Sequence, residues 1–230
     1  MADALTTTSP AGTAPAHAHA HGHDPLVAHH FHDLDQQHHA AKLGVWVFLV
    51  TEILLFGGLF CFYSVFRAWH PEMFHNCHQF LNWKLGALNT VVLIASSGTV
   101  ALAIRAIQRN QRQQCIWLLI ITILCAFTFM VVKYFEYSHK IHDGLLPGMY
   151  FTSTEVPRTY HVFFSIYFTM TGLHGIHVMG GMFFMIWLVR RLLLGQFDST
   201  HYTAIEMGGL YWHLVDLIWI YLFPLLYLVG

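Results

Sequence analysis

The sequence predicts an all-α membrane protein with five transmembrane helices in a bundle. Five long apolar runs support this prediction: Leu43–Phe66, Leu85–Ile104, Cys115–Val132, Tyr160–Val189 and Met207–Gly230. Each run has about 18 residues or more, enough for a helix to cross a hydrocarbon core of ~30 Å. The chain is also 56% hydrophobic and only 10% charged, whereas soluble domains carry ~25% charged residues. It therefore has too few charges to cover a soluble domain of this size.

Residues 1–41 differ in composition from the rest and predict a polar, flexible tail ahead of a membrane domain at 42–230. The tail has no Lys or Arg before position 42, and histidines alternate with small residues at His17, His19, His21 and His23. Such histidines can bind a divalent metal. We favour a tail without a specific site, because alternating His and Ala lack the fixed geometry that a metal site requires.

The first two runs indicate close helix packing. The first run begins after Lys42, and Gly57 with Gly58 near its middle allows another helix to approach. The connection that follows, up to Lys84, contains Pro71 and several aromatic residues typical of a membrane interface. The second run is rich in Gly, Ala, Ser and Asn, which favours tight packing over catalysis.

The last three runs carry more polar residues. The third leads into Lys133 and Glu136, which are one helical turn apart and can pair at the membrane edge. An irregular loop is expected over residues 138–158, which include two prolines and two glycines. The fourth run, of about 30 residues, is long enough to require tilting or projection beyond the lipid. The fifth extends to the C-terminus and is interrupted only by Pro224.

The distribution of basic residues predicts a cytoplasmic N-terminus and a periplasmic C-terminus. This orientation places six bases on the cytoplasmic side, namely Lys42, Arg105, Arg109, Arg112, Arg190 and Arg191. The other side then carries Arg67, Lys84, Lys133, Lys140 and Arg158. The arginines cluster in two short loops, as the positive-inside rule expects. A net charge of -1 gives no support for a nucleic-acid partner.

Ionisable residues inside the runs are the candidates for function, because a charge in lipid costs ~2.5 kcal/mol or more. Glu52 has no base near it in its own run, so it is either protonated or faces a cavity or a partner protein. His174 and His177 share a helix face, and His213 and Asp216 repeat that spacing. Together these four could ligate haem or a metal. We favour interhelical hydrogen bonds, because small residues flank the histidines.

Five segments resemble subunit III of haem–copper respiratory oxidases. They are KLGVWVFLVTEILLF (42–56), LNTVVLIASSGT (88–99), FEYSHKIHDG (135–144), TGLHGIHVMGG (171–181) and IEMGGLYWHLVDLIWIYLFPLLYL (205–228). The resemblance covers nearly everything from residue 42 onward. It departs from the mitochondrial pattern, because the first two of seven family helices are missing, as in bacterial five-helix forms.

The resemblance implies an accessory subunit without catalytic residues, haem or copper of its own. Haem and copper would lie in partner subunits I and II, with subunit I the main contact, and subunit IV or a larger supercomplex as further partners. The complex would reduce oxygen and pump protons in the bacterial inner membrane. Subunit III of this family holds phospholipid in a cleft between helices and supports proton uptake and sustained turnover.

The resemblance also assigns residues. Glu52 matches the intramembrane carboxylate of the family that reacts with carbodiimides, and Arg191 and His201 match positions that hold lipid head groups. The expected polar network between helices comprises Glu136, His174, His177, Glu206, His213 and Asp216.

Several alternatives remain open from the sequence. The electron donor is either cytochrome c or quinol; VTEILLF favours cytochrome c, whereas quinol-oxidase relatives also have a His-rich tail. An accessory subunit of a nitric oxide reductase is a further alternative, as is an autonomous haem-binding cytochrome. A transporter would require internal repeats and broken helices, and no repeat is found.

Overall fold

The computed structural model describes residues 34–147, 157–197 and 202–229. The chain divides into two compact units, residues 1–40 and 41–230, and the helix bundle belongs to the second. Five helices are long and apolar enough to cross a membrane, which confirms the predicted fold class. They are α1 (Leu34–Trp69), α3 (Trp83–Gln108), α4 (Arg112–His142), α5 (His161–Leu193) and α6 (Thr203–Phe223).

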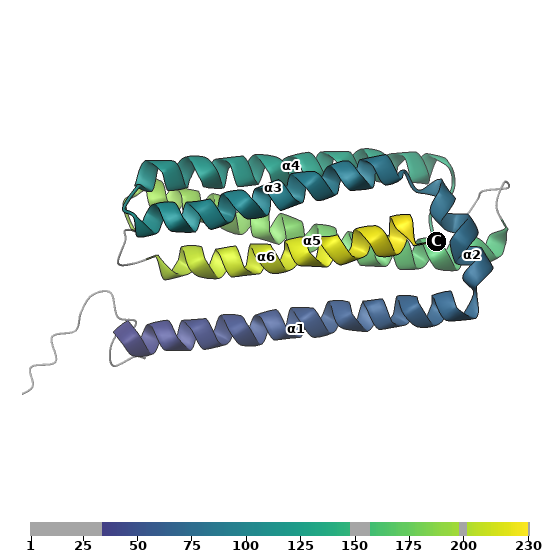
Figure 1. Cartoon of the computed structure of the whole chain (residues 1–230), viewed down its shortest axis with the longest axis horizontal. Coiled ribbons are helices and arrows are strands. Elements are labelled where there is room, and N and C mark those ends of the chain that lie inside the picture. The colour runs from purple at the N-terminus through teal and green to yellow at the C-terminus, as the bar shows by residue number, and fades with distance from the viewer. Residues whose placement is uncertain (1–33, 148–156, 198–201, 230) are drawn as a thin grey trace, which may run out of the picture. The chain divides into compact units, whose positions relative to one another are not determined.

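Helices α3, α4, α5 and α6 form a ring in which each contacts two neighbours, and they run along a common direction (Figure 1). The connection between α3 and α4 is short, so the two helices are antiparallel. Asn110 adopts a left-handed conformation there (φ 58°), which Asn tolerates better than most residues. Asn82 caps the start of α3, where its Oδ1 accepts hydrogen bonds from Lys84 N at 3.1 Å and Leu85 N at 3.4 Å.

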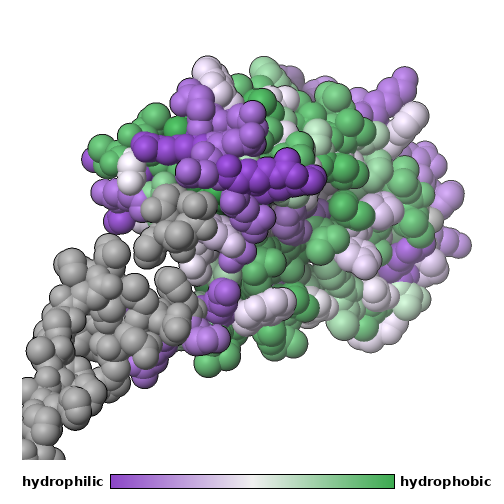
Figure 2. Space-filling view, turned by 60° about the vertical axis from the view of Figure 1, so that its left-hand side comes forward, coloured by the Kyte–Doolittle hydropathy of each residue, from purple (hydrophilic) through white to green (hydrophobic). Residues whose placement is uncertain are grey.

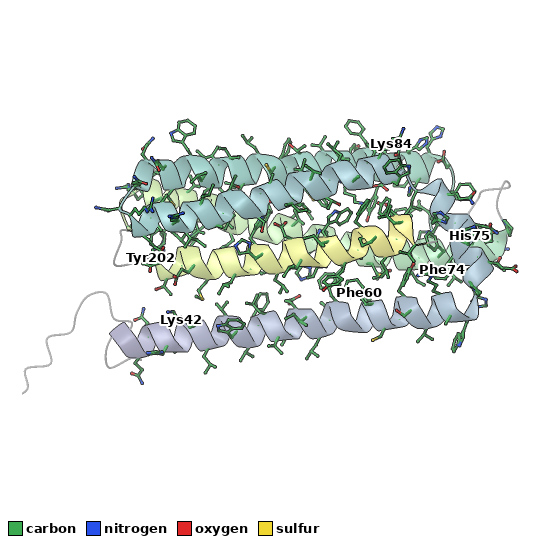
Figure 3. All side chains as sticks on the ribbon, in the orientation of Figure 1. Lys42, Phe60, Phe74, His75, Lys84 and Tyr202 are labelled. Atoms are coloured by element: carbon green, nitrogen blue, oxygen red, sulfur yellow. The ribbon has the colours of Figure 1, made fainter. Side chains whose placement is uncertain are left out.

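Helix α1 lies against this ring through one narrow stripe. Leu49, Phe56 and Tyr63 are its buried hydrophobic residues and recur every seven positions. Tyr63 donates a hydrogen bond of 2.6 Å to Leu225 O, and Phe60 reaches toward α6, where its ring lies 6.3 Å from that of Tyr221 (Figure 3). The remaining circumference of α1 is largely exposed and apolar.

The outer surfaces of the helices suit a hydrocarbon environment. Large apolar side chains such as Leu54, Val91, Phe127 and Phe183 are more than half exposed. Figure 2 shows hydrophobic residues across the flank of the bundle and hydrophilic residues gathered toward its ends. A surface of this kind is stable only where lipid or another apolar protein surface covers it.

Two segments that were expected to connect the membrane helices are partly helical. Helix α4 continues to His142, so residues 138–142 are helical rather than part of an irregular loop. The connection before Lys84 contains a short helix, α2 (Pro71–Cys77), whose first residue is a proline, a residue favoured at that position.

Burial raises the pKa of the Cys77 thiol to about 12, so this cysteine stays protonated.

Helix α6 changes its geometry at Pro224, the residue that interrupts the fifth run. The backbone changes to a π-helical turn at Pro224–Leu228. Proline cannot donate the backbone hydrogen bond of a regular helix, which explains why the change occurs there. The turn places Tyr227 inside the bundle, 3% exposed.

Glycines allow α6 to approach both of its neighbours closely. A Cβ atom on Gly208 would lie 2.6 Å from Phe184 Cε1 of α5, and one on Gly209 would lie 2.6 Å from Ile104 Cδ1 of α3. On α5, a Cβ on Gly181 would lie 2.8 Å from the ring of Trp212. Small residues at helix contacts are the usual solution in membranes, where packing replaces the hydrophobic effect.

We expect Gly181→Ala to destabilise the protein by ~1–3 kcal/mol, the usual effect of overpacking a core. Trp212 cannot move easily, because it is fully buried and its Nε1 donates a hydrogen bond to Ser96 Oγ at 3.0 Å. Gly175→Ala is the matched control, since a Cβ there has nothing within 4 Å. Thermal unfolding of the purified protein in detergent measures both; equal melting temperatures for the two variants would contradict the packing argument.

Candidate functional site

A glutamate and a histidine join α1 to α5 within the membrane domain. Glu52 Oε2 and His177 Nε2 lie 2.7 Å apart, and their side chains are only 13% and 14% exposed. The His177 ring packs edge-on against Phe56, with centroids 5.3 Å apart. Glu52 therefore has a partner, although none was visible within its own run of sequence.

The hydrogen bonds of His177 determine how protons are shared in this pair. His177 Nδ1 lies 2.8 Å from Leu173 O, and a carbonyl oxygen can only accept, so Nδ1 must carry a proton. Nε2 then faces Glu52 in one of two ways: protonated against a carboxylate, or bare against a protonated carboxyl group. In both cases one proton lies between the two side chains and the pair is neutral overall. A neutral pair avoids the large cost of an isolated charge in the membrane.

A second cluster of polar residues centres on Glu136. The carboxylate accepts four contacts, from Lys133 Nζ at 2.9 Å, Tyr167 Oη at 2.9 Å, Tyr227 Oη at 2.6 Å and, more distantly, Lys140 Nζ at 3.7 Å. Both lysines and Glu136 are at most 6% exposed. Lys133 and Glu136 therefore pair, as the sequence predicted, and they do so inside the bundle.

Aromatic rings surround the Lys133 ammonium group. Its Nζ lies 4.6 Å from the ring centroid of Trp219 and 5.2 Å from that of Tyr227, and it donates a hydrogen bond to Tyr227 Oη at 2.7 Å. Cation–π contacts stabilise a cation most where water is excluded. The cluster thus holds α4, α5 and the C-terminal π-helical turn together through ionised groups.

The other predicted network residues occupy separate positions. His213 Nδ1 lies 2.6 Å from Ser97 Oγ, which joins α6 to α3. His174 is fully buried and packs against Trp219 and Phe129, with centroids 5.2 and 5.5 Å away. Asp216 is 2% exposed. Glu206 lies half-buried in the first turn of α6, where an acid favourably faces the helix dipole.

This arrangement agrees only in part with the hypothesis that these histidines and Asp216 tie α5 to α6. His174 of α5 does pack against Trp219 of α6, but the other two histidines have partners on other helices. His177 reaches α1 and His213 reaches α3. Helices α5 and α6 are also joined by glycine and aromatic packing and by Tyr211 Oη, which donates to His177 O at 3.0 Å. Helical spacing correctly placed the residues on common faces, but it could not identify the helix that each face meets.

Of the residues expected to bind lipid or metal, Arg191 lies within the described residues. Arg191 is near the end of α5, and its guanidinium lies 4.7 Å from the ring centroid of Trp187. His201 and the tail histidines His17, His19, His21 and His23 lie outside the described residues. Within the described ranges, no group of three His, Cys, Asp or Glu side chains is placed to hold a metal ion.

An apolar groove of 470 Å³ runs between α1 and α5. Its walls include Leu59, Phe62 and Phe66 of α1 and Ile166 and Met170 of α5. Such a groove on a membrane-facing surface has the size and chemistry to receive part of an acyl chain.

Sequence reasoning missed the partners of Glu136, namely Lys140, Tyr167 and Tyr227. A usable signal was present, because Lys133, Glu136 and Lys140 follow a spacing of three and four residues, which places all three on one helix face. Tyr227 could not be found this way, since its position depends on the π-helical turn.

The comparisons with known proteins agree with the membrane helix bundle. A family model described as cytochrome c oxidase subunit III matches residues 27–230. The chain belongs to the cytochrome c oxidase subunit III family. Haem–copper oxidases of this family use either cytochrome c or quinol, and both kinds occur among the relatives.

Three relatives illustrate this range. The probable cytochrome c oxidase subunit 3 of Nocardia farcinica is 32% identical over 82% of this chain and 87% of the relative. The probable quinol oxidase subunit 3 of Staphylococcus saprophyticus is 27% identical over 89% and 98% of the two chains. The cytochrome bo(3) ubiquinol oxidase subunit 3 of Pseudomonas aeruginosa is 28% identical over 86% and 91%.

We expect Glu136→Gln to destabilise subunit III by ~3–5 kcal/mol, because it leaves Lys133 and Lys140 buried without their shared counter-charge. Adding Lys133→Met should recover part of the loss by removing one of the two uncompensated cations. Glu72→Gln is the control, since Glu72 is exposed on α2. Thermal unfolding in detergent compares the unsubstituted protein, Glu136→Gln, the double variant and Glu72→Gln. If Glu136→Gln alone were as stable as Glu72→Gln, the proposed ion cluster would be contradicted.

Proposed function

We propose that this chain is a non-redox accessory subunit of a proton-translocating cytochrome c oxidase. It packs on subunit I in a complex with subunit II, binds phospholipid, and supports proton uptake and sustained turnover. The observation that carries the proposal is the 2.7 Å contact between Glu52 Oε2 and His177 Nε2, which joins α1 to the bundle through two titratable groups. The polar side chains of the Glu136 cluster are committed to one another, which favours a structural over a redox role.

The outer surface of α1 is the best candidate for the contact with subunit I. Leu43, Val47, Val50 and Leu54 recur at helical spacing and are 50–69% exposed. Because the stripe that attaches α1 to the bundle is narrow, a neighbouring subunit would hold this helix in place and fix the geometry of Glu52.

Phospholipid binding rests on two features. The groove between α1 and α5 is apolar, and Arg191 lies at the end of α5 with its guanidinium over Trp187. A cation beside an interfacial tryptophan is well suited to a phosphate head group. His201 is proposed as a second head-group ligand by its match to the family.

The structure strengthens the argument for a cytoplasmic N-terminus. Lys133 and Lys140 are buried in α4 and so do not act as loop charges. The periplasmic side then retains Arg67, Lys84 and Arg158, against six bases on the cytoplasmic side.

The electron donor is tested by activity of the purified complex. We propose cytochrome c because the Nocardia relative carries that name, with quinol as the second candidate from the Staphylococcus and Pseudomonas relatives. Oxygen consumption with reduced cytochrome c, but not with ubiquinol, supports the first. A complex that reduces nitric oxide instead of oxygen, or a Soret band in the isolated chain, would contradict the proposal.

We expect Glu52→Gln to leave assembly intact but to shorten the time over which the oxidase sustains turnover. Glutamine keeps the size of the side chain, and its pair with a neutral His177 stays uncharged overall, but it cannot release a proton. The initial rate of oxygen consumption should change less than the rate at which activity decays during continuous turnover. Glu72→Gln provides the exposed control. Equal decay for both variants, or loss of the whole complex in Glu52→Gln alone, would show that Glu52 does not act in this way.

A further inference from the structure

Three buried polar side chains in the ring of α3, α4, α5 and α6 have no hydrogen-bond partner among the described residues. They are Asn89, His174 and Asp216, which are 0%, 0% and 2% exposed. Every side-chain nitrogen and oxygen of the three is unpartnered. Glu52 Oε2 also forms no well-aligned hydrogen bond, but it lies on α1, outside this ring, and a titratable group faces it at 2.7 Å, His177 Nε2.

Other buried polar residues of the same ring are fully engaged. Ser96 accepts from Trp212 Nε1 and donates to Leu93 O, and Thr122 contacts both Thr99 Oγ1 and Leu118 O. The three unpartnered residues are therefore exceptions within this bundle and require an explanation of their own.

The three residues lie near one tryptophan, Trp219, on three helices. The His174 ring lies 5.2 Å from that of Trp219, and Asp216 is one helical turn before Trp219 on the same face of α6. Asn89 precedes Thr90, whose Oγ1 accepts the hydrogen bond of Trp219 Nε1 at 3.0 Å. All three thus lie within about one turn of the same ring, on three different helices.

Nearby protein groups do not supply all the hydrogen bonds that Asn89, His174 and Asp216 can form. Ser97 lies beside Asp216, and its hydroxyl can accept from His213 Nδ1 at 2.6 Å while donating one hydrogen bond to the Asp216 carboxyl. That single donor cannot serve both oxygens of Asp216, and it leaves the His174 ring and the Asn89 amide without a partner. The described residues around this position also lack a third acidic, histidine or cysteine ligand that would indicate a metal ion. The missing partner must both donate and accept hydrogen bonds, since the set contains an amide, an imidazole and a carboxyl group.

We propose that the core of the ring holds ordered water molecules bound to Asn89, His174 and Asp216. Water supplies both donors and acceptors and is the usual partner of polar groups that a folded protein leaves unsatisfied. In this site it hydrates Asp216 inside the membrane, and Ser97 and His213 extend the polar chain from Asp216 toward the outside of the ring.

A high-resolution density map of the intact complex in lipid is the direct test. We expect peaks at ~2.7–3.2 Å from the Asp216 carboxyl, the His174 ring and the Asn89 amide, the range of ordinary hydrogen bonds. Thr122 is the internal control, because it is equally buried but already bonded, and no peak is expected beside it. Side chains that bond directly to one another, with no density between them, would overturn the proposal.

Infrared spectroscopy gives an independent test that does not depend on map quality. The difference between the complex and its Asp216→Asn variant isolates the carboxyl band, and recording it in a Ser97→Ala background removes the nearest hydroxyl. We expect a hydrogen-bonded carbonyl frequency that survives Ser97→Ala. A carboxylate band would also support water, because no protein donor would then remain nearby. A free-carbonyl frequency in that background would refute the hydrated site.

Discussion

The arrangement of this subunit depends on the requirement that every charge placed between the helices be neutralised there. A bilayer supplies no water to do so, and an isolated ion is costly at this depth. The molecule meets the requirement in two ways. The Glu136 cluster keeps its groups ionised and surrounds the carboxylate with donors from α4, α5 and the C-terminal turn. The Glu52–His177 pair instead shares a proton and remains neutral.

The two solutions have different mechanical consequences. The Glu136 carboxylate accepts contacts from four side chains, so displacing any one helix would leave buried charges uncompensated. The Glu52–His177 contact is a single pair and is supported by a narrow apolar stripe. We therefore regard the ring of α3 to α6 as the rigid part of the subunit, and the attachment of α1 as the contact most sensitive to lipid or to a neighbouring subunit.

The fold was predictable from the sequence because the length of an apolar run is a direct response to membrane thickness. Helix ends were less predictable. Helix α4 extends past the end of its apolar run because Lys133, Glu136 and Lys140 neutralise one another inside the bundle. Charged residues can therefore continue the helix beyond the point where hydropathy alone predicts its end. Similarly, no local pattern indicated that Pro224 would produce a π-helical turn that brings Tyr227 to Glu136.

The candidate site was only half predictable, for a related reason. Periodicity shows which residues of one helix share a face, but the partner of that face is fixed by the packing of the whole bundle. His174 and His177 differ by three positions, yet one is enclosed by Trp219 and Phe129 while the other reaches Glu52 on α1. The same holds for His213, which contacts Ser97 of α3 rather than α5. Because close approach at Gly181, Gly208 and Gly209 determines which faces meet, the glycines specify the polar contacts as firmly as the polar residues themselves.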